Sequence, residues 1–333
     1  MTELKAAVVG LGQMGRKHVR VLRELEGIEL VAVADVKGDY DGIAVGLPVV
    51  NSAEDLLDYD IDLCVIATPT DNHFESGLVM AEAGVNTLIE KPIASNLKLS
   101  DELISAFASS GVTACVGHIE RFNPAIRAMR ERLLKGQLGR IFQISTRRQG
   151  PFVERVRDVG VVKDLGTHDL DLAMWLIDES IISVAANTAY RMGREDEDLA
   201  SISTMFENGI IGNHLVNWVN PFKERVVQVV GEKGCLVADT VTADLTFWAN
   251  EGLVSGDWDV LIHSRGVSEG DVVRYAIKKP EPLQVELEAF RDAVLGIQND
   301  TVSLEEGRSV LKVAEACLDS AKINSAITIE KKV

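Results

Sequence analysis

In the first third of the chain, short apolar runs alternate with segments whose apolar residues recur at helical spacing. Continuous apolar runs predict strands of a parallel sheet, because such strands are covered on both faces. Strands that alternate with helices indicate βαβ units and a doubly wound sheet. The predicted strands cover residues 4–10, 28–35, 61–68, 86–91 and 112–117, and the predicted helices cover 13–26, 71–83 and 97–109.

Beyond about residue 120, runs that alternate apolar with polar residues become frequent, and they predict strands. These strands cover residues 141–148, 183–191, 200–206, 210–218, 225–230 and 236–240, and helices are expected over 124–135, 164–177, 282–295 and 304–320. A long succession of strands favours one large, mainly antiparallel sheet. We therefore predict an α/β protein with an N-terminal domain built on a doubly wound parallel sheet over 1–120 and an α+β domain over 121–333.

The composition narrows the choice of partners. The 333 residues carry a net charge of −17, so the surface should repel phosphate backbones, and we expect no nucleic-acid partner.

No apolar run approaches the roughly 18 residues that span a bilayer. The chain enters a strand directly after its first residues, so we expect no targeting segment and a cytoplasmic location. Cys64, Cys115, Cys235 and Cys317 are far apart, and we expect buried free thiols.

A glycine pattern links the first predicted strand to the first predicted helix, which is the context that a dinucleotide site requires. Gly10 would permit the tight turn, Gly12 would let the backbone approach a pyrophosphate, and Gly15 would let the helix pack closely on the sheet. The alternative is a structural turn in another α/β protein. The G-x-G-x-x-G pattern consists of Gly10, Leu11, Gly12, Gln13, Met14 and Gly15.

Asp35 ends the second predicted strand, 20 residues after Gly15. A carboxylate there can accept hydrogen bonds from the ribose hydroxyls of a dinucleotide. It would also repel a 2′-phosphate, so the sequence favours NAD over NADP. Lys37 lies close by and weakens this preference.

Glu90, Lys91 and Pro92 follow a predicted strand, and the carboxyl ends of strands line the ligand crevice of open α/β sheets. Lys91 would project a cation toward the nicotinamide side of this crevice. Pro92 could adopt a cis peptide and so fix the direction of the preceding side chains. The alternative for Lys91 is a solvated position at a strand-to-helix turn.

Asp164 and His168 are four residues apart, so on a helix they share a face. A carboxylate beside an imidazole can fix its tautomer and raise its basicity. Asp171 could join the same face. One alternative is an acid-rich first helical turn with His168 incidental. A metal site formed by these three residues is another, but no further His or Cys lies nearby, so we expect no metal.

Together these segments resemble the Gfo/Idh/MocA family of nicotinamide-dependent sugar oxidoreductases, and the resemblance covers essentially the whole chain. EKP combined with D-x-x-x-H is its most specific part. The resemblance implies an NAD-binding Rossmann domain over 1–120 and, over 121–333, an α+β domain for substrate binding and oligomerisation. It also implies a homodimer or homotetramer formed through the open sheet face. The matching segments are GLGQMG at 10–15, ATPTDNH at 67–73, EKP at 90–92, GHIERFNP at 117–124 and DLGTHDLDLAMW at 164–175.

The resemblance also implies roles for individual residues. His168 would take the hydroxyl proton as general base, Lys91 would stabilise the developing alkoxide, and Asp164 would position His168 or the hydroxyl. NAD would accept the hydride. For His73 the alternative is packing on the turn before its helix. Residues expected along the cofactor, besides the glycine turn and Asp35, are Thr68, Pro69, Thr70, His73, Glu90 and Lys91.

One segment departs from the family. Between Asp35 and a short strand at 49–50, the family usually has a helix, whereas residues 37–48 are few and interrupted by glycine. We therefore predict a loop beside the adenine.

Basic residues cluster in two segments of the second domain, namely Arg121, Arg147, Arg148, Arg155, Arg157 and Lys163. Guanidinium groups suit bidentate contacts with phosphate or carboxylate, so the cluster could bind an anionic substrate. The alternative is a solvated basic loop that pairs with acidic neighbours or a second subunit. Asn123 is a candidate sugar contact, or else the N-cap of the helix that begins at Pro124. The expected substrate contacts are Arg121, Asn123, Arg148, Lys163, Asp164 and His168.

These two segments are most similar to the nucleotide-sugar branch of the family. That implies hydride transfer from a sugar hydroxyl carbon, C3 of a nucleotide sugar such as UDP-N-acetylglucosamine. One alternative is an inositol or free-sugar dehydrogenase of the same family. Another is a non-catalytic NAD-binding sensor, although such a protein would not need Lys91, Asp164 and His168 together.

Overall fold

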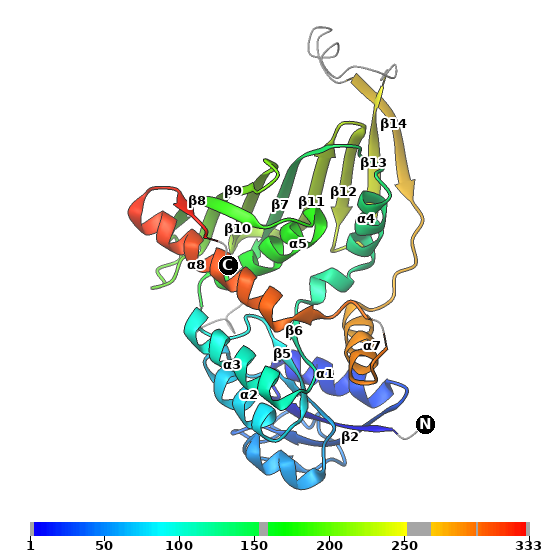
Figure 1. The fold of residues 1–333 in the computed structure, drawn as a ribbon, viewed down its shortest axis with the longest axis vertical. Helices are drawn as coiled ribbons and strands as arrows, with labels where there is room; N and C mark the ends of the chain where they lie inside the picture. The colour runs from blue at the N-terminus through cyan, green and yellow to red at the C-terminus, as the bar shows by residue number, and fades with distance from the viewer. Residues whose placement is uncertain (1–2, 153–158, 252–267, 298, 331–333) are drawn as a thin grey trace. The chain divides into compact units, whose positions relative to one another are not determined.

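The computed structural model describes residues 3–152, 159–251, 268–297 and 299–330 (Figure 1). Their contacts separate the chain into two compact units. Unit 1 comprises Met1–Ile119 and Glu281–Lys312, and unit 2 comprises Glu120–Pro280 and Val313–Val333. We expected all of 121–333 to form the second domain, but Glu281–Lys312 packs with unit 1. The physical reason is that helix α7 (Pro282–Val294) buries apolar side chains in the core of unit 1.

Unit 1 contains a seven-stranded sheet in the order β15-β6-β5-β4-β1-β2-β3. Six strands are parallel and only β15 is antiparallel, which confirms the predicted doubly wound sheet. The carboxyl ends of the parallel strands therefore meet at one edge. The strands are β1 (Leu4–Val9), β2 (Ile28–Ala34), β3 (Val49–Val50), β4 (Leu63–Ile66), β5 (Asn86–Glu90), β6 (Ala114–Gly117) and β15 (Val302–Ser303).

Helices cover both faces of this sheet (Figure 1). On one face, α1 (Gln13–Glu24) and α7 pack through Leu22, Leu287 and Phe290. On the other, α2 (His73–Glu82), α3 (Leu97–Ser110) and the beginning of α8 (Leu304–Ile323) bury a second apolar cluster. Residues 36–48 form turns rather than a helix, as predicted for the segment beside the adenine. The 3₁₀-helix η1 (Glu54–Tyr59) follows β3.

Unit 2 contains a nine-stranded sheet in the order β14-β13-β12-β11-β7-β10-β9-β8-β16. It is mainly antiparallel, as predicted, with one parallel pair between β7 and β10. The pattern did not predict β13, β14 or β16. The strands are β7 (Ile141–Pro151), β8 (Ile181–Ala189), β9 (Leu199–Phe206), β10 (Ile211–Asn217), β11 (Val219–Gly231), β12 (Gly234–Asp239), β13 (Asp244–Glu251), β14 (Ser268–Tyr275) and β16 (Ile327–Thr328).

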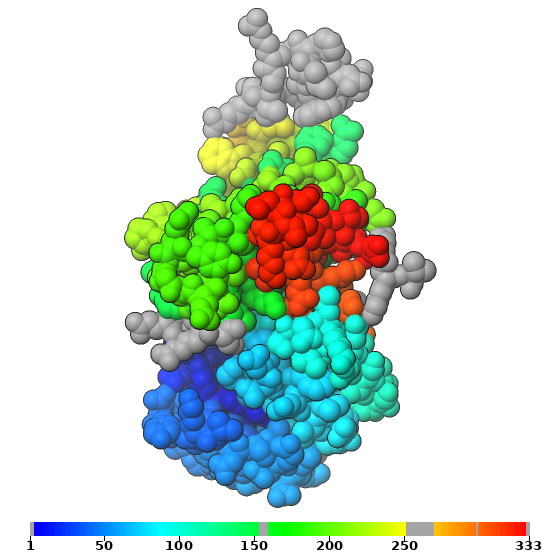
Figure 2. Space-filling model, turned by 90° about the vertical axis from the view of Figure 1, so that its left-hand side faces the viewer, coloured from blue at the N-terminus to red at the C-terminus, as the bar shows by residue number. Residues whose placement is uncertain are grey.

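One face of this second sheet carries α4 (Pro124–Leu134) and α5 (Thr167–Ile177) (Figure 1). Side chains alternate along the strands, so that in β9 Ile202 and Phe206 are buried while Ser203 and Met205 are exposed. At one edge of this sheet, β16 pairs with β8. The end of α8 (red in Figure 2) packs against β8, where the Ala186 N–H donates a hydrogen bond to Ser320 Oγ.

None of the described helices is both long and apolar enough to cross a membrane. Cys64, Cys115 and Cys317 are buried free thiols, as expected. Cys235 is only half-buried, because it projects from the face of the unit 2 sheet that α4 and α5 do not cover.

Candidate active site

The glycine turn between β1 and α1 shows which glycines serve the fold. Gly10 has a φ of +92°, and a Cβ there would lie 2.7 Å from the Ala67 carbonyl oxygen. A Cβ on Gly15 would lie 1.7 Å from the carbonyl oxygen of Gly10, so this glycine allows α1 to pack against the turn. A Cβ on Gly12 would meet nothing within 4 Å. Gly12 therefore leaves open space at the N-terminus of α1, where no described side chain caps the first turn.

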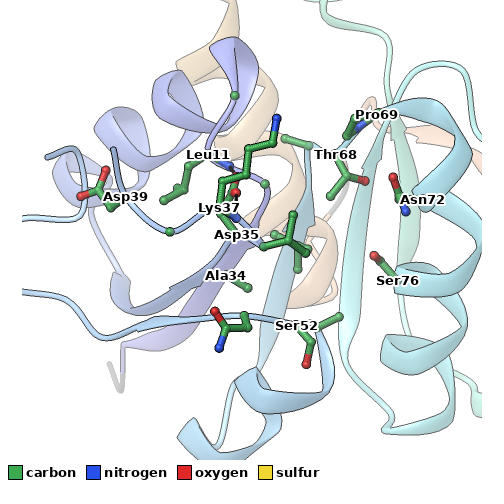
Figure 3. A pocket seen from close by; sticks show the side chains of 18 of the residues that line it. Leu11, Ala34, Asp35, Lys37, Asp39, Ser52, Thr68, Pro69, Asn72 and Ser76 are labelled. Atoms are coloured by element: carbon green, nitrogen blue, oxygen red, sulfur yellow. Dashed lines mark hydrogen bonds between the residues drawn. The ribbon is translucent and has the colours of Figure 1, made fainter. Parts of the chain in front are cut away.

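The turn borders a pocket of about 500 Å³ within unit 1 (Figure 3). Asp35 lies in this pocket, where its Oδ2 accepts a hydrogen bond from the Leu11 N–H at 2.7 Å and its Oδ1 accepts one from the Lys37 N–H at 2.8 Å. Each carboxylate oxygen has a further lone pair for a ribose hydroxyl. Of the predicted cofactor residues, those that line the pocket are Gly10, Leu11, Gly12, Asp35, Thr68 and Pro69.

Thr68 also fits a bound dinucleotide. Its buried Oγ1 has no hydrogen-bond partner among the described residues, which is costly unless a ligand supplies one. The pocket includes residues that the sequence patterns missed, because they come from separate elements: Ser52 after β3, and Asn72 and Ser76 on one face at the start of α2. With the open space at Gly12, these features fit a dinucleotide.

The remaining predicted cofactor residues do not line the pocket, namely Gln13, Met14, Gly15, Thr70, His73, Glu90 and Lys91. His73 is buried, and its ring joins two turns: Nδ1 lies 2.8 Å from the Pro92 carbonyl oxygen and Nε2 lies 3.0 Å from that of Thr68. This geometry matches packing on the turn, the alternative that the sequence left open.

Glu90 ends β5 and is buried against α1. Its Oε1 lies 2.8 Å from Nε2 of His18, which is also buried. Burial opposes ionisation of Glu90, but the hydrogen bond and charge of His18 hold the pKa of the carboxyl below its usual value. Gly117 on β6 leaves room for this carboxylate, because a Cβ there would lie 3.3 Å from Oε2.

Lys91 follows Glu90 at the strand-end edge that also carries the glycine turn, since β5 and β1 run parallel in the same sheet. Its peptide bond to Pro92 is cis, a form that the sequence allowed. The side chain of Lys91 is half-buried.

In unit 2, Asp164 lies in a π-helical turn (η4, Val162–Gly166) that leads directly into α5. The prediction of a regular helix from Asp164 onward is therefore wrong for its first turn. Single π-helical turns occur frequently at functional sites. His168 is the second residue of α5, and the side chains of Asp164 and His168 are both half-buried. Their joint action with Lys91, which belongs to unit 1, stays a prediction.

Glu197, which the sequence patterns missed, holds the start of this π-helical turn. Its Oε1 accepts a hydrogen bond from the Val162 N–H at 2.9 Å, and burial raises the pKa of the carboxyl. Gly160 leaves the space that this carboxylate fills, since a Cβ there would lie 2.1 Å from Oε2. No local motif marks Glu197, because it is 35 residues from its partner.

Two of the expected anion-binding arginines are engaged inside the protein. Arg121 forms a forked ion pair with Asp171, with the shortest contact 2.6 Å from Nη2 to Oδ1. Arg148 donates from Nε to Asp169 at 2.6 Å and from Nη1 to Glu120 at 2.7 Å. Both guanidinium groups are almost fully buried. The structure therefore favours pairing with acidic neighbours over substrate contact for Arg121 and Arg148, and the carboxylate of Asp171 is engaged by Arg121.

Lys163 and Asn123, two other expected substrate contacts, also have internal partners. Lys163 lies 3.6 Å from Glu315. Arg147, which belongs to the basic cluster but is not an expected contact, pairs with Glu224 at 2.9 Å. Asn123 is the N-cap of α4, where its side chain accepts a hydrogen bond from the Ala125 N–H.

Arg155 and Arg157 lie outside the described residues. Within the part of the chain that the structure describes, no cluster of three His, Cys, Asp or Glu side chains could hold a metal ion.

The glycine pocket, the doubly wound sheet and the large antiparallel sheet together define an oxidoreductase fold that binds a nicotinamide dinucleotide. Two models of the GFO/IDH/MocA family match this chain, the oxidoreductase family with NAD-binding Rossmann fold over residues 4–118 and its C-terminal domain over 126–237, so the chain belongs to that family.

Among curated relatives, scyllo-inositol 2-dehydrogenase (NAD(+)) from Bacillus subtilis is 29% identical, over 72% of this chain and 75% of the relative. UDP-N-acetylglucosamine 3-dehydrogenase from Acidithiobacillus ferrooxidans is 29% identical, over 64% of this chain and 66% of the relative. A solved structure of the latter matches with a TM-score of 0.82 and 25% identity, over 97% and 99% of the two chains. GenD2 from gentamicin A biosynthesis, solved with NAD, shares the fold at a TM-score of 0.82 and 24% identity, over 99% and 97%.

Proposed function

We propose that the protein is an NAD-dependent dehydrogenase that oxidises a CH–OH group of a sugar or nucleotide sugar. The observation that carries this proposal is that one chain contains both the Asp35 pocket, in unit 1, and the half-buried Asp164 and His168, in unit 2. The named dehydrogenases among its relatives support the reaction class.

Bound NAD would supply the hydride acceptor. His168 takes the proton of the substrate hydroxyl, which raises electron density on the oxygen before the hydride leaves. Lys91 stabilises the alkoxide charge through its ammonium group. Asp164 orients His168 or the hydroxyl, and Glu197 fixes the backbone that carries Asp164.

The preference for NAD over NADP rests on the charges of the pocket. Asp35 lies where the ribose hydroxyls would bind, and four further acids line the same pocket. Lys37 is exposed, and the Arg16 guanidinium near the pocket is paired with Asp41. A 2′-phosphate would therefore meet mainly negative charge.

For the substrate, we propose C3 of a nucleotide sugar such as UDP-N-acetylglucosamine, which the similarity to UDP-N-acetylglucosamine 3-dehydrogenase supports. A second candidate is an inositol or a free sugar. The internal ion pairs of Arg121 and Arg148 favour this second class, because they leave fewer cations for a pyrophosphate.

The test is absorbance at 340 nm with purified protein and NAD, with UDP-N-acetylglucosamine, myo-inositol or scyllo-inositol in separate cuvettes and NADP in parallel. Reduction with the nucleotide sugar alone would support the first assignment, and reduction with an inositol alone would replace it by the second. If NADH binds but no member of a broad panel of sugars, cyclitols and nucleotide sugars is oxidised, the dehydrogenase proposal fails in favour of a sensor.

We also infer that the open face of the unit 2 sheet forms a homodimer or homotetramer contact. Apolar side chains form two groups along this face, namely Val272, Trp248, Cys235 and Val230 on one side of Gln143, and Ile211 and Met205 on the other. Four of them are more than a third exposed in the single chain, which favours burial against a second copy. Light scattering at micromolar concentration tests this inference, and a monomer would contradict it.

A further inference from the structure

Arg225 differs from its two arginine neighbours on β7. It lies on β11 directly opposite Arg148, so the two side chains project from the same face of the sheet. Like charges at opposed positions repel each other. Arg148 takes both nearby carboxylates, those of Asp169 and Glu120. Within the described residues, no carboxylate lies at ion-pair distance from Arg225.

The hydrogen bonds of Arg225 go only to uncharged acceptors. Nη1 donates to the carbonyl oxygens of Gln149 at 2.5 Å and Glu224 at 2.8 Å, and these are its only hydrogen bonds to the described part of the chain. A guanidinium has five N–H groups in a planar fork. Those on Nε and Nη2 are therefore available for a planar or tetrahedral anion.

The position of Arg225 relates it to the predicted catalytic turn of the same unit. Burial and the charge of Arg148 lower the pKa of Arg225 to about 10, while Asp169, Glu120 and Asp164 act in the opposite direction. The guanidinium is therefore charged at neutral pH, and Asp164 is close enough to influence it. A half-buried cation without a counterion is costly, and a bound anion would offset that cost.

We propose that Arg225 binds an anionic group of the substrate, so that unit 2 holds both this group and the reacting hydroxyl. This inference rests on the proposed dehydrogenase function and narrows its substrate class to sugars that carry a phosphate or a carboxylate. The phosphate could belong to a nucleoside diphosphate sugar, and the carboxylate to a uronic acid.

The experiment compares Arg225→Ala and Arg225→Lys with Arg147→Ala. Arg147 is the matched control, because it is an exposed arginine on the opposite face of the same sheet. Binding of UDP-N-acetylglucosamine, glucuronate and inorganic pyrophosphate is measured by calorimetry on protein saturated with NADH, so that the cofactor site is filled. NAD reduction is followed with the first two compounds and with myo-inositol.

We expect Arg225→Ala to weaken binding of the anionic ligand by roughly 10- to 100-fold, the usual effect of a lost charge-assisted hydrogen bond. Arg225→Lys should retain part of the affinity, and Arg147→Ala should bind within twofold of the wild type. NADH binding and any myo-inositol turnover should not change in either Arg225 variant. If the affinity for the nucleotide sugar falls, the anion is a phosphate, and if the affinity for glucuronate falls, the anion is a carboxylate.

Equal losses for charged and neutral ligands would overturn the proposal, because they would indicate a structural role. So would a wild type that oxidises myo-inositol but binds none of the anions, in which case the dehydrogenase function would stand without Arg225. A protein that binds NADH and the anions but oxidises nothing would contradict the proposed function and leave anion binding by Arg225 measurable.

Discussion

His18 and Glu90 form a buried pair that joins helix α1 to the end of strand β5. Nε2 of His18 lies 2.8 Å from Oε1 of Glu90, and the His18 side chain is fully buried. The glycine turn precedes α1 and Lys91 follows Glu90. The pair therefore links the backbone of the dinucleotide pocket to the backbone of the predicted catalytic lysine.

Removing one partner of this pair should lower the free energy of unfolding more than removing both partners. His18→Leu leaves Glu90 buried without its partner, and we expect a loss of roughly 3 kcal/mol in the free energy of unfolding. The double variant His18→Leu/Glu90→Met should recover most of that stability, because no uncompensated polar group is left. Turnover should stay low in the double variant, since Lys91 is no longer positioned. Urea unfolding and kcat measure the two effects, and recovery of full turnover would contradict the positioning role.

Gly12 and Gly15 should separate cofactor binding from folding. In Gly12→Ala the new methyl group meets no protein atom, so unfolding should change by less than about 0.5 kcal/mol. It would occupy space beside the N-terminus of α1, and we expect NADH affinity to fall at least about 10-fold. In Gly15→Ala the methyl group overlaps the Gly10 carbonyl, and the fold should be strongly destabilised. Fluorescence titration and thermal unfolding test both variants, and normal NADH binding by Gly12→Ala would argue against the pyrophosphate position.

Asp35 should determine the choice between NAD and NADP. Asp35→Ser removes the charge that repels a 2′-phosphate, while Lys37 stays near the same site. We expect the ratio of kcat/KM for NADP to that for NAD to rise at least about 10-fold. In Asp35→Ser/Lys37→Ala this gain should disappear. An unchanged ratio in the single variant would mean that Asp35 only holds the glycine turn through Leu11.

His168 should distinguish a dehydrogenase from a sensor. His168→Ala removes the proposed general base, and kcat should fall roughly 100- to 10,000-fold. NADH affinity should be unaffected, because the dinucleotide pocket belongs to unit 1. The exposed strand residue Asn187 provides a control, and Asn187→Ala should keep wild-type turnover. If His168→Ala turned over substrate at the wild-type rate, the proposed base would be wrong.

His214 should make the protein sensitive to acid. It is buried between Thr146 and Thr204, and burial lowers its pKa from 6.5 to about 4. Between these two values, only the unfolded chain takes up the proton, so the free energy of unfolding falls as the pH drops from 6.5 to 4. This single group could cost up to about 3 kcal/mol.

Urea unfolding across this range should show a shallower pH dependence for His214→Gln than for the wild type. Identical slopes would show that His214 does not contribute to the acid sensitivity.

The sequence was sufficient for the features that depend on local periodicity. The alternation of apolar runs and helical segments gave β1 to β6 and α1 to α3, and the glycine-broken segment 37–48 correctly predicted a loop. The pattern missed β14, which is an edge strand with mostly exposed side chains and therefore a weak apolar signal. It also missed the π-helical turn at Asp164, because five residues are too few to show a period of their own within a helical pattern.

The site was harder to predict wherever a charge had a distant partner. Local sequence showed that Arg121 and Arg148 are basic and close to the predicted catalytic turn, but not that Asp171, Glu120 and Asp169 neutralise them. The sequence did not predict Arg225 as a site residue, because it lies in a strand without a recognisable motif. The register of β11 against β7 places it beside Arg148, and competition for two carboxylates leaves it without one.

By itself, the sequence determined the alternation of strands and helices in unit 1, the dinucleotide turn with Asp35, and the family, because these depend on residues that are neighbours along the chain. Only the tertiary structure decided which charges compensate one another, that Glu281–Lys312 packs with unit 1, and that Glu197 holds the turn of Asp164. The physical reason is that ion pairing and burial depend on distance in space, and the partners are separated by tens of residues of chain.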